Sequence, residues 1–310
     1  MNGKRKLTLK MLRALHNGLG IPAKILLQGE SEKFPDDYST MEWEKFPLNE
    51  LKKRMTFSPV SASKECAEEF IRYLIKIAGY CPNVATPCFR LGSYNGAKGD
   101  QYAILAWELV VRARARKKKM SVNFSFNNFS DDNLRRLANL SIHEEGPIMA
   151  ANYLEQHGII LIVEKTLPKA KVDGVTLLLD ETTPVIGLSL RQDRIDSFWF
   201  TLFHELAHLQ KHVSTAQNKC IIDIDIDEDT TELMEQEANT IASNALIPKH
   251  IWDNDEAKLR GSRQAVINLA RSLDIHPAIV AGRVRKYKNN YKIFHVWQES
   301  EAQPIFGTYL

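Results

Sequence analysis

Residues 204–208 read His-Glu-Leu-Ala-His, a spacing that suits metal chemistry if the segment is helical. Positions four apart lie nearly one above the other on an α-helix, so His204 and His208 present two imidazoles on one face, close enough to bind one ion. Glu205 lies about 100° around the helix from His204, where its carboxylate can take a proton from a water beside the metal. Histidine nitrogen suits zinc, and a catalytic zinc keeps one position open for that water. The motif therefore predicts one zinc per chain, with Glu205 as the general base of a metallopeptidase.

Two histidines need a third ligand, and the next predicted helix supplies candidates. Glu235 and Asn239 are four residues apart and share a face, beside two alanines that allow close helix packing. Glu235 would complete a His₂Glu set, a known arrangement for catalytic zinc. Glu237 is the alternative ligand because it belongs to the same turn but faces elsewhere. Asn239 is a candidate to orient one of the histidines.

The elements that must position these residues follow from hydrophobic periodicity and turn signals. Apolar residues recur at helical spacing in most of the chain, whereas short runs rich in β-branched residues predict buried strands. Helices in front of a strand-then-helix back half give an α+β fold class. The predicted helices span residues 61–78, 101–119, 131–140, 146–157, 197–212, 230–246, 262–273 and 277–286, and the predicted strands 158–163, 174–180 and 184–190.

Strand 184–190 comes shortly before the histidine-bearing helix. In a zinc peptidase such a strand can form a wall of the cleft and pair with an extended substrate backbone. An ordinary core strand is the other interpretation, and the two are compatible.

Net charge, apolar runs and cysteine spacing indicate which partners and which cellular location to expect. The 310 residues carry a net charge of +3, so the overall charge gives no reason to expect nucleic acid as a partner. No apolar run approaches the length of a membrane span, and the basic N-terminus lacks the apolar core of a signal peptide. The four cysteines form no Cys-x-x-Cys pair and read as reduced thiols. We therefore predict a cytoplasmic protein with no membrane partner.

The back half resembles the ImmA/IrrE family of metallo-endopeptidases over about the last 150 residues. The resemblance implies a zincin-like fold with a small sheet and a His-Glu-x-x-His active-site helix. It also implies a zinc held by the two histidines and a downstream glutamate, and cleavage of a regulatory protein. Ala207 stands where the family often has glycine, which leaves the chemistry intact. The residues that carry the resemblance are Pro184–Arg191, Phe198–His208, Glu235–Asn239, Leu246–Pro248 and Ile275–Arg283.

The front end, Leu7–Gln28, resembles the closing helices of the helix-turn-helix domain of HigA-like antitoxins. A helix-turn-helix reads bases with its second helix, and only what would follow that helix is present here. We therefore expect no specific DNA binding by this chain. The domain prediction is a helix-turn-helix remnant at 1–30, a linker at 31–60, a helical domain at 61–157 and a zincin-like peptidase domain at 158–310.

The resulting functional hypothesis is a gluzincin-like zinc endopeptidase that cleaves a repressor or antitoxin in transcriptional, toxin-antitoxin or stress control. The alternative is an antitoxin-like regulator or protein-binding module whose metal site is structural or silent. His212 lies one further turn along the helix and is predicted to be peripheral. The basic run 112–119 is predicted to be a solvated helix end. The alternating aspartates from Asp223 to Asp229 predict a short exposed strand or an acidic loop.

Overall fold

The computed structural model describes residues 41–55, 60–79, 99–125, 129–213, 220–224 and 233–294. Residues 42–310 form one compact unit, and the account below concerns this unit. The predicted helix-turn-helix remnant at 1–30 lies outside the described residues, and the division of the rest into a helical and a peptidase domain stays a prediction. None of the described helices is long and apolar enough to cross a membrane.

A mixed sheet of four strands lies at the centre of this unit, with strand order β1-β3-β2-β4. Strand β3 pairs in parallel with β1 and antiparallel with β2, so both of its edges are occupied. It is the predicted core strand, but the prediction that it pairs with a substrate backbone is wrong, because that needs an open edge. The strands are β1 (Ile160–Val163), β2 (Val172–Leu178), β3 (Pro184–Leu188) and β4 (Cys220–Ile224).

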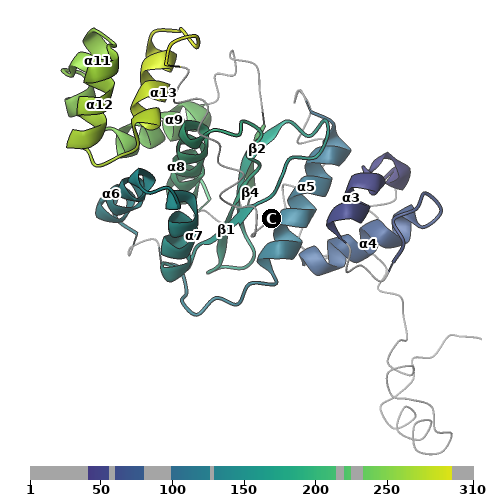
Figure 1. Ribbon diagram of the computed structural model, residues 1–310. Helices are drawn as coiled ribbons and strands as arrows, with labels where there is room; N and C mark the ends of the chain where they lie inside the picture. Colours follow the sequence, from purple (N-terminus) through teal and green to yellow (C-terminus); the bar gives the residue numbers. More distant parts are fainter. Residues whose placement is uncertain are drawn as a thin grey trace, which may run out of the picture. The chain divides into compact units, whose positions relative to one another are not determined.

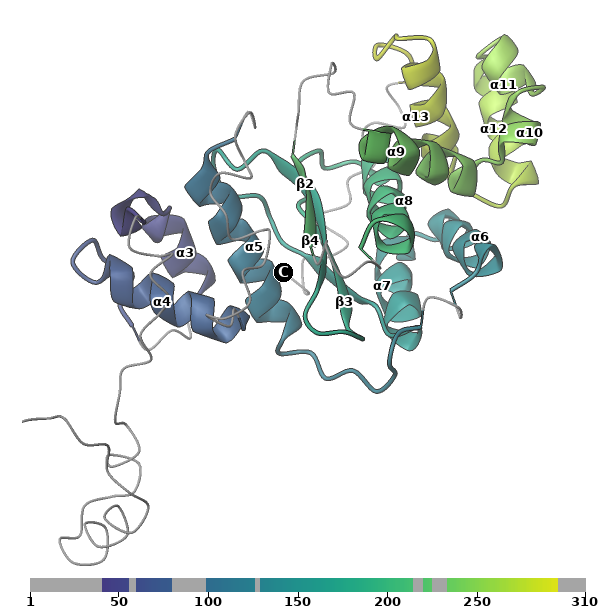
Figure 2. The same cartoon turned by 180° about the vertical axis from the view of Figure 1, so that it is seen from behind.

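Helices cover both faces of the sheet (Figures 1 and 2). Helix α5 (Gln101–Ala115) lies on one face. The indole N–H of its residue Trp107 donates a hydrogen bond of 2.9 Å to the backbone carbonyl of Glu164, just after β1. Because α5 is itself covered by α4 (Ala67–Ala78), it is buried nearly all round. Helices α7 (Gly146–Gln156) and α8 (Ile195–Lys211) lie on the opposite face. The histidine-bearing helix is therefore held between the sheet and the helices that follow.

Among the C-terminal helices, α9 and α13 pack against α8, while α11 and α12 pack against each other and against α13 (Figure 2). Local sequence explains their starts: the Ser262 side chain accepts the backbone N–H of Ala265, and Pro277 occupies the first turn of the last helix. These helices are α9 (Leu233–Leu246), α10 (Lys249–Trp252), α11 (Glu256–Leu259), α12 (Arg263–Ser272) and α13 (Pro277–Tyr287).

The helices predicted from periodicity are all present, most with ends within two or three residues of the expected ones. From Trp43 onward the predicted linker 31–60 contains regular structure, namely η2 (Trp43–Lys45) and helix α3 (Leu48–Arg54). Leu48 and Leu51, three residues apart, are buried and give this short helix its apolar side. The remaining elements are α6 (Asp131–Asn139) and η6 (Leu140–Ile142).

The basic run 112–119 is only partly the solvated helix end that we predicted. The Arg112 side chain is 5% exposed and pairs with Glu108 at 2.7 Å, and Arg114 pairs with the buried Glu164 at 2.6 Å. Arg116 donates to the carbonyl of Ala78. These arginines therefore join α5 to its neighbours, which periodicity alone does not reveal.

The cysteine prediction also needs a correction. Cys66 is a free thiol, but Cys220, the first residue of β4, is disulfide-bonded. The spacing of cysteines in a sequence does not show which segments the fold brings together. This result removes the cysteine argument for a cytoplasmic location, which stays a prediction.

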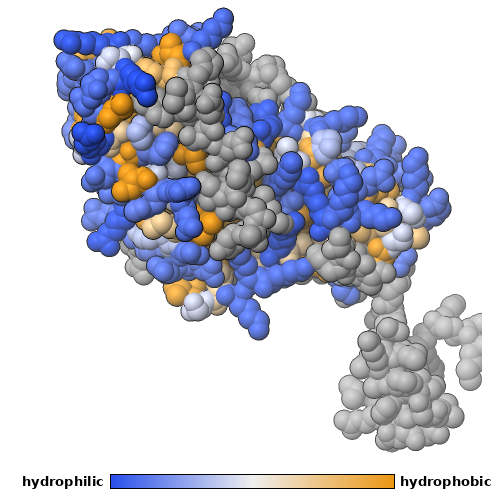
Figure 3. All heavy atoms as spheres, viewed as in Figure 1, coloured by the Kyte–Doolittle hydropathy of each residue, from blue (hydrophilic) through white to orange (hydrophobic). Residues whose placement is uncertain are grey.

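Hydrophilic side chains dominate the face shown in Figure 3, and the apolar ones form small separate groups. Single exposed apolar residues of this kind are normal on a protein surface.

Candidate metal centre

Helix α8 carries His204, Glu205 and His208 on a segment whose other positions belong to the core. Phe198, Trp199 and other large apolar side chains of α8 are buried in that core, which fixes the rotation of the helix about its axis. All three polar side chains are buried as well, with 3% exposure for His204 and none for Glu205 or His208. Burying polar groups costs free energy unless they have partners, so these three side chains need hydrogen bonds, ion pairs or a bound metal within the site.

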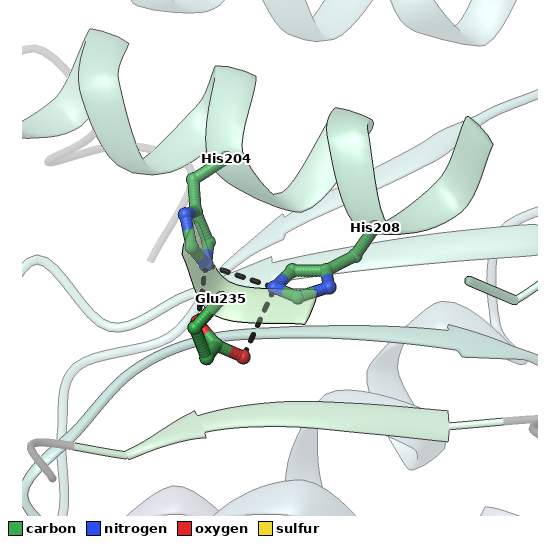
Figure 4. Close-up of side chains that lie close together, drawn as sticks. All are labelled: His204, His208 and Glu235. Atoms are coloured by element: carbon green, nitrogen blue, oxygen red, sulfur yellow. Dashed lines mark hydrogen bonds and ion pairs between the residues drawn. The ribbon is translucent and has the colours of Figure 1, made fainter. Parts of the chain in front are cut away.

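Helix α9 brings Glu235 to the two imidazoles. The small residues Ala238 and Ala242 are fully buried, which allows α9 to approach α8 closely. One carboxylate oxygen of Glu235 lies 3.1 Å from Nε2 of His204, and the other lies 3.3 Å from Nε2 of His208. Figure 4 shows the histidines projecting from one helix toward the carboxylate. The structure thus brings together the three residues that the sequence singled out as ligands.

The donor set fits a divalent metal of the zinc type. The two Nε2 atoms are 2.9 Å apart, and the ligand atoms of all three residues lie within 4.8 Å of one another. Two imidazole nitrogens and a carboxylate that converge in a buried place are the ligands of a known class of catalytic zinc site. Their role as metal ligands stays a prediction, and the geometry is compatible with it.

The protonation states of the site also suit a metal. Burial lowers the pKa of His208, which favours the neutral imidazole that coordinates metals. Burial alone would raise the pKa of Glu235, but hydrogen bonds and charge interactions with His204 and His208 hold it far below the ordinary value. Glu235 is therefore ionised at neutral pH.

Strand β2 holds the side chain of Glu205. The hydroxyl of Thr176 lies 2.6 Å from Oε2 of Glu205 and 2.9 Å from its backbone carbonyl. Two residues earlier, Gly174 has no side chain, and a Cβ there would lie 2.2 Å from Oε1 of Glu205. The register of β2 with β4 shifts between Val172 and Gly174, which marks a β-bulge beside the site. The predicted general base thus has a fixed position against the sheet.

Thr176→Val removes the hydroxyl that orients Glu205 and keeps the shape of the side chain. We expect roughly a tenfold to hundredfold lower rate of peptide cleavage, the usual effect of losing an outer partner of a metal site, with zinc content unchanged. The measurement is cleavage of a random-sequence peptide mixture, followed by mass spectrometry. Thr240→Val is the matched control because Thr240 is exposed on α9 and, among the described residues, bonds only to the carbonyl of Gln236. Equal rates for the two variants would contradict the role given to Thr176.

Residues 154–284 match the family model described as the IrrE N-terminal-like domain of a peptidase family. This part of the chain is therefore similar to the ImmA/IrrE family. The match spans β1 through most of α13 and includes His204, Glu205, His208 and Glu235. It supports a metallopeptidase with the zincin-like α+β fold, and peptidases of this family are zinc-dependent. Comparisons with curated proteins and with solved structures found no match.

The matched segment also contains a contact that our sequence analysis missed. Nδ1 of His208 lies 2.9 Å from Nδ1 of His212, and Nε2 of His212 lies 3.2 Å from a carboxylate oxygen of Glu237. A metal-binding histidine commonly donates its second ring N–H to such an outer partner. The prediction of a peripheral His212 is therefore wrong, and Glu237 contacts His212 rather than the two motif histidines.

Other predicted participants lie elsewhere or cannot be placed. Asn239 lines a cavity together with Glu235, and no hydrogen bond from it to His204 or His208 occurs among the described contacts. Asp223 belongs to β4, whereas Asp225, Asp227 and Asp229 lie outside the described residues.

Proposed function

We propose that this protein is a zinc-dependent metallo-endopeptidase with His204, His208 and Glu235 as metal ligands and Glu205 as general base. The observation that carries the proposal is the convergence of three ligand atoms within 4.8 Å, next to a glutamate fixed by Thr176. The family match supports the same class of reaction.

The residues of the chain divide the chemistry among them. A bound zinc ion would polarise a water molecule and the peptide carbonyl and lower the pKa of that water. Glu205 accepts the proton of the water at its carboxylate and then passes it to the leaving amine. Glu235 stays ionised throughout, and Thr176 keeps the carboxylate of Glu205 in one orientation.

The proposed substrate is a regulatory protein of the repressor or antitoxin type. Its support is the similarity of residues 154–284 to the ImmA/IrrE family, together with the resemblance in sequence, untested by the structure, of residues 7–28 to HigA-like antitoxins. In the described part of the sheet, β1 and β4 are the outer strands, so an extended substrate backbone would have to pair with one of these.

A second candidate function is protein binding with a structural or silent metal site. The observation that favours it is the complete burial of Glu205 and His208, because structural sites are closed and catalytic sites keep an open position. Cleavage by the wild type and its loss in Glu205→Gln would reject this candidate.

The first experiment is metal analysis of the purified full-length chain by mass spectrometry. We expect about one zinc per chain in the wild type and almost none in His204→Ala or Glu235→Ala, because a His₂Glu site loses a third of its ligands in each variant. His250→Ala serves as control, since His250 is exposed on α10. A wild type without metal, or variants that retain it, would contradict the proposed ligand set.

A further inference from the structure

A cavity of about 640 Å³ reaches Glu235 of the candidate metal centre and is lined by residues of the first half of α8. Glu235 belongs both to the three converging residues and to the cavity wall. The rest of the wall comes from β2, from the end of β3 and the segment after it, from the first half of α8, and from α9, α13 and Tyr291. A ligand that reaches the metal centre from this side would therefore contact the wall.

Positive charge on this wall exceeds negative charge. Three carboxylates line the cavity, namely Asp173, Asp196 and Glu235. Glu235 is engaged with the two histidines and is a proposed metal ligand. The cations are Arg191, Arg194, Arg283, Arg285 and Lys286.

In the cavity wall, the carboxylate of Asp196 pairs with two arginines, Arg194 and Arg285. Arg191 makes a two-point contact with Asp173, at 2.9 and 2.8 Å, so these charges balance. Asp196 is 3.1 Å from Nε of Arg194 and 2.7 Å from Nη2 of Arg285. One carboxylate thus serves two guanidinium groups, and Arg285 is only 1% exposed. A net positive charge remains beside the N-terminus of α8, whose helix dipole adds to it.

Two further cations have no carboxylate partner among the described ion pairs. Arg283 donates to the carbonyls of Ser243 and Ile247 at the end of α9, and burial lowers its pKa only to about 10, so it stays charged. The ammonium of Lys286 lies 5.1 Å from the ring centroid of Phe200. The surface of Lys286 is exposed at the edge of the cavity, so a ligand can reach its ammonium, and partial burial of that ammonium lowers its pKa below the ordinary value for lysine.

Apolar side chains complete the wall, among them Leu188, Leu246 and Ile279. A cavity with apolar walls and an excess of cations suits an anion carried on a methylene chain. A glutamate or aspartate side chain of a peptide has this chemistry.

We infer that this cavity binds an acidic side chain of the peptide substrate, with Lys286 and Arg194 as the groups that contact its carboxylate. The inference rests on the proposed function because it takes the ligand to be a substrate peptide. It adds a preference for acidic residues near the scissile bond, which neither the motif nor the family match specifies.

The test uses two fluorescein-labelled peptide pools that are identical except that one has glutamate where the other has glutamine. Binding to the zinc-loaded full-length protein is measured by fluorescence anisotropy. We expect the glutamate pool to bind roughly tenfold more tightly, with the difference falling as salt increases. Lys286→Met should remove most of the difference, and Arg194→Gln should reduce it.

Lys288→Met is the matched control, because Lys288 is exposed next to the same helix and its ammonium bonds, within the described part of the chain, only to the carbonyl of Arg260. It should keep the preference for the glutamate pool. Equal binding of the two pools, no binding of either, or displacement by inorganic phosphate without a glutamate–glutamine difference would each overturn the inference.

Cleavage of the same pools by the wild type separates this inference from the proposed function. Cleavage without an acidic preference would reject the acidic subsite and leave the peptidase standing. Selective binding of the glutamate pool without cleavage would support the subsite and reject the peptidase.

Discussion

Glu205→Gln is expected to lower the rate of peptide cleavage roughly 10²- to 10⁴-fold while the protein keeps its zinc, because positioned general bases contribute acceleration of that order. Glutamine has the size of glutamate, and its amide oxygen can still accept the hydrogen bond from Thr176. The substitution therefore removes the proton acceptor with little change in packing. The measurement combines cleavage of a random-sequence peptide mixture with metal analysis of the same preparation.

The control for this prediction is Glu256→Gln, which makes the same chemical change at a side chain that is 61% exposed on α11. It should leave both the cleavage rate and the zinc content close to those of the wild type. If Glu205→Gln cleaves as fast as the wild type, Glu205 is not the base. If the substitution also releases zinc, its effect on cleavage cannot be assigned to proton transfer.

Periodicity predicted the part of the site that lies on single helices. The His-Glu-x-x-His spacing on an apolar helix placed His204 and His208 on one face, and the structure shows them converging. The choice of Glu235 over Glu237 came from the face it shares with small residues, and the observed contacts separate the two in the same way. Such features follow from local helix geometry, which the sequence encodes directly.

Features that depend on neighbouring segments could not be predicted in this way. The contact of His212 with His208 follows the same four-residue spacing and was open to prediction, whereas the contact of His212 with Glu237 depends on the packing of α9. Thr176 and Gly174 are about thirty residues from Glu205 in sequence, and only the packing of α8 on β2 brings them together. No periodic pattern carries that information.

Gly174→Ala is expected to disable the site without touching a ligand or the base. The added methyl carbon would lie 2.2 Å from Oε1 and 2.9 Å from Cγ of Glu205, well inside contact distance. Glu205 is fully buried and bound to Thr176, so its carboxylate can make room only by leaving its position. We expect a loss of about 10²-fold in cleavage rate, the effect of an error of about 1 Å in the position of a reacting group.

The same variant should keep its zinc and lose about 1–3 kcal/mol of unfolding free energy, a typical cost of overpacking. Metal analysis and urea denaturation measure these quantities beside the cleavage rate. Gly187→Ala is the control, because a Cβ there would lie 2.7 Å from Val175 in the same sheet without meeting Glu205. It should lose a similar amount of stability and keep most of its activity. A matching loss of activity in both variants would attribute the effect to strain in the sheet, whereas a loss confined to Gly174→Ala assigns it to the position of Glu205.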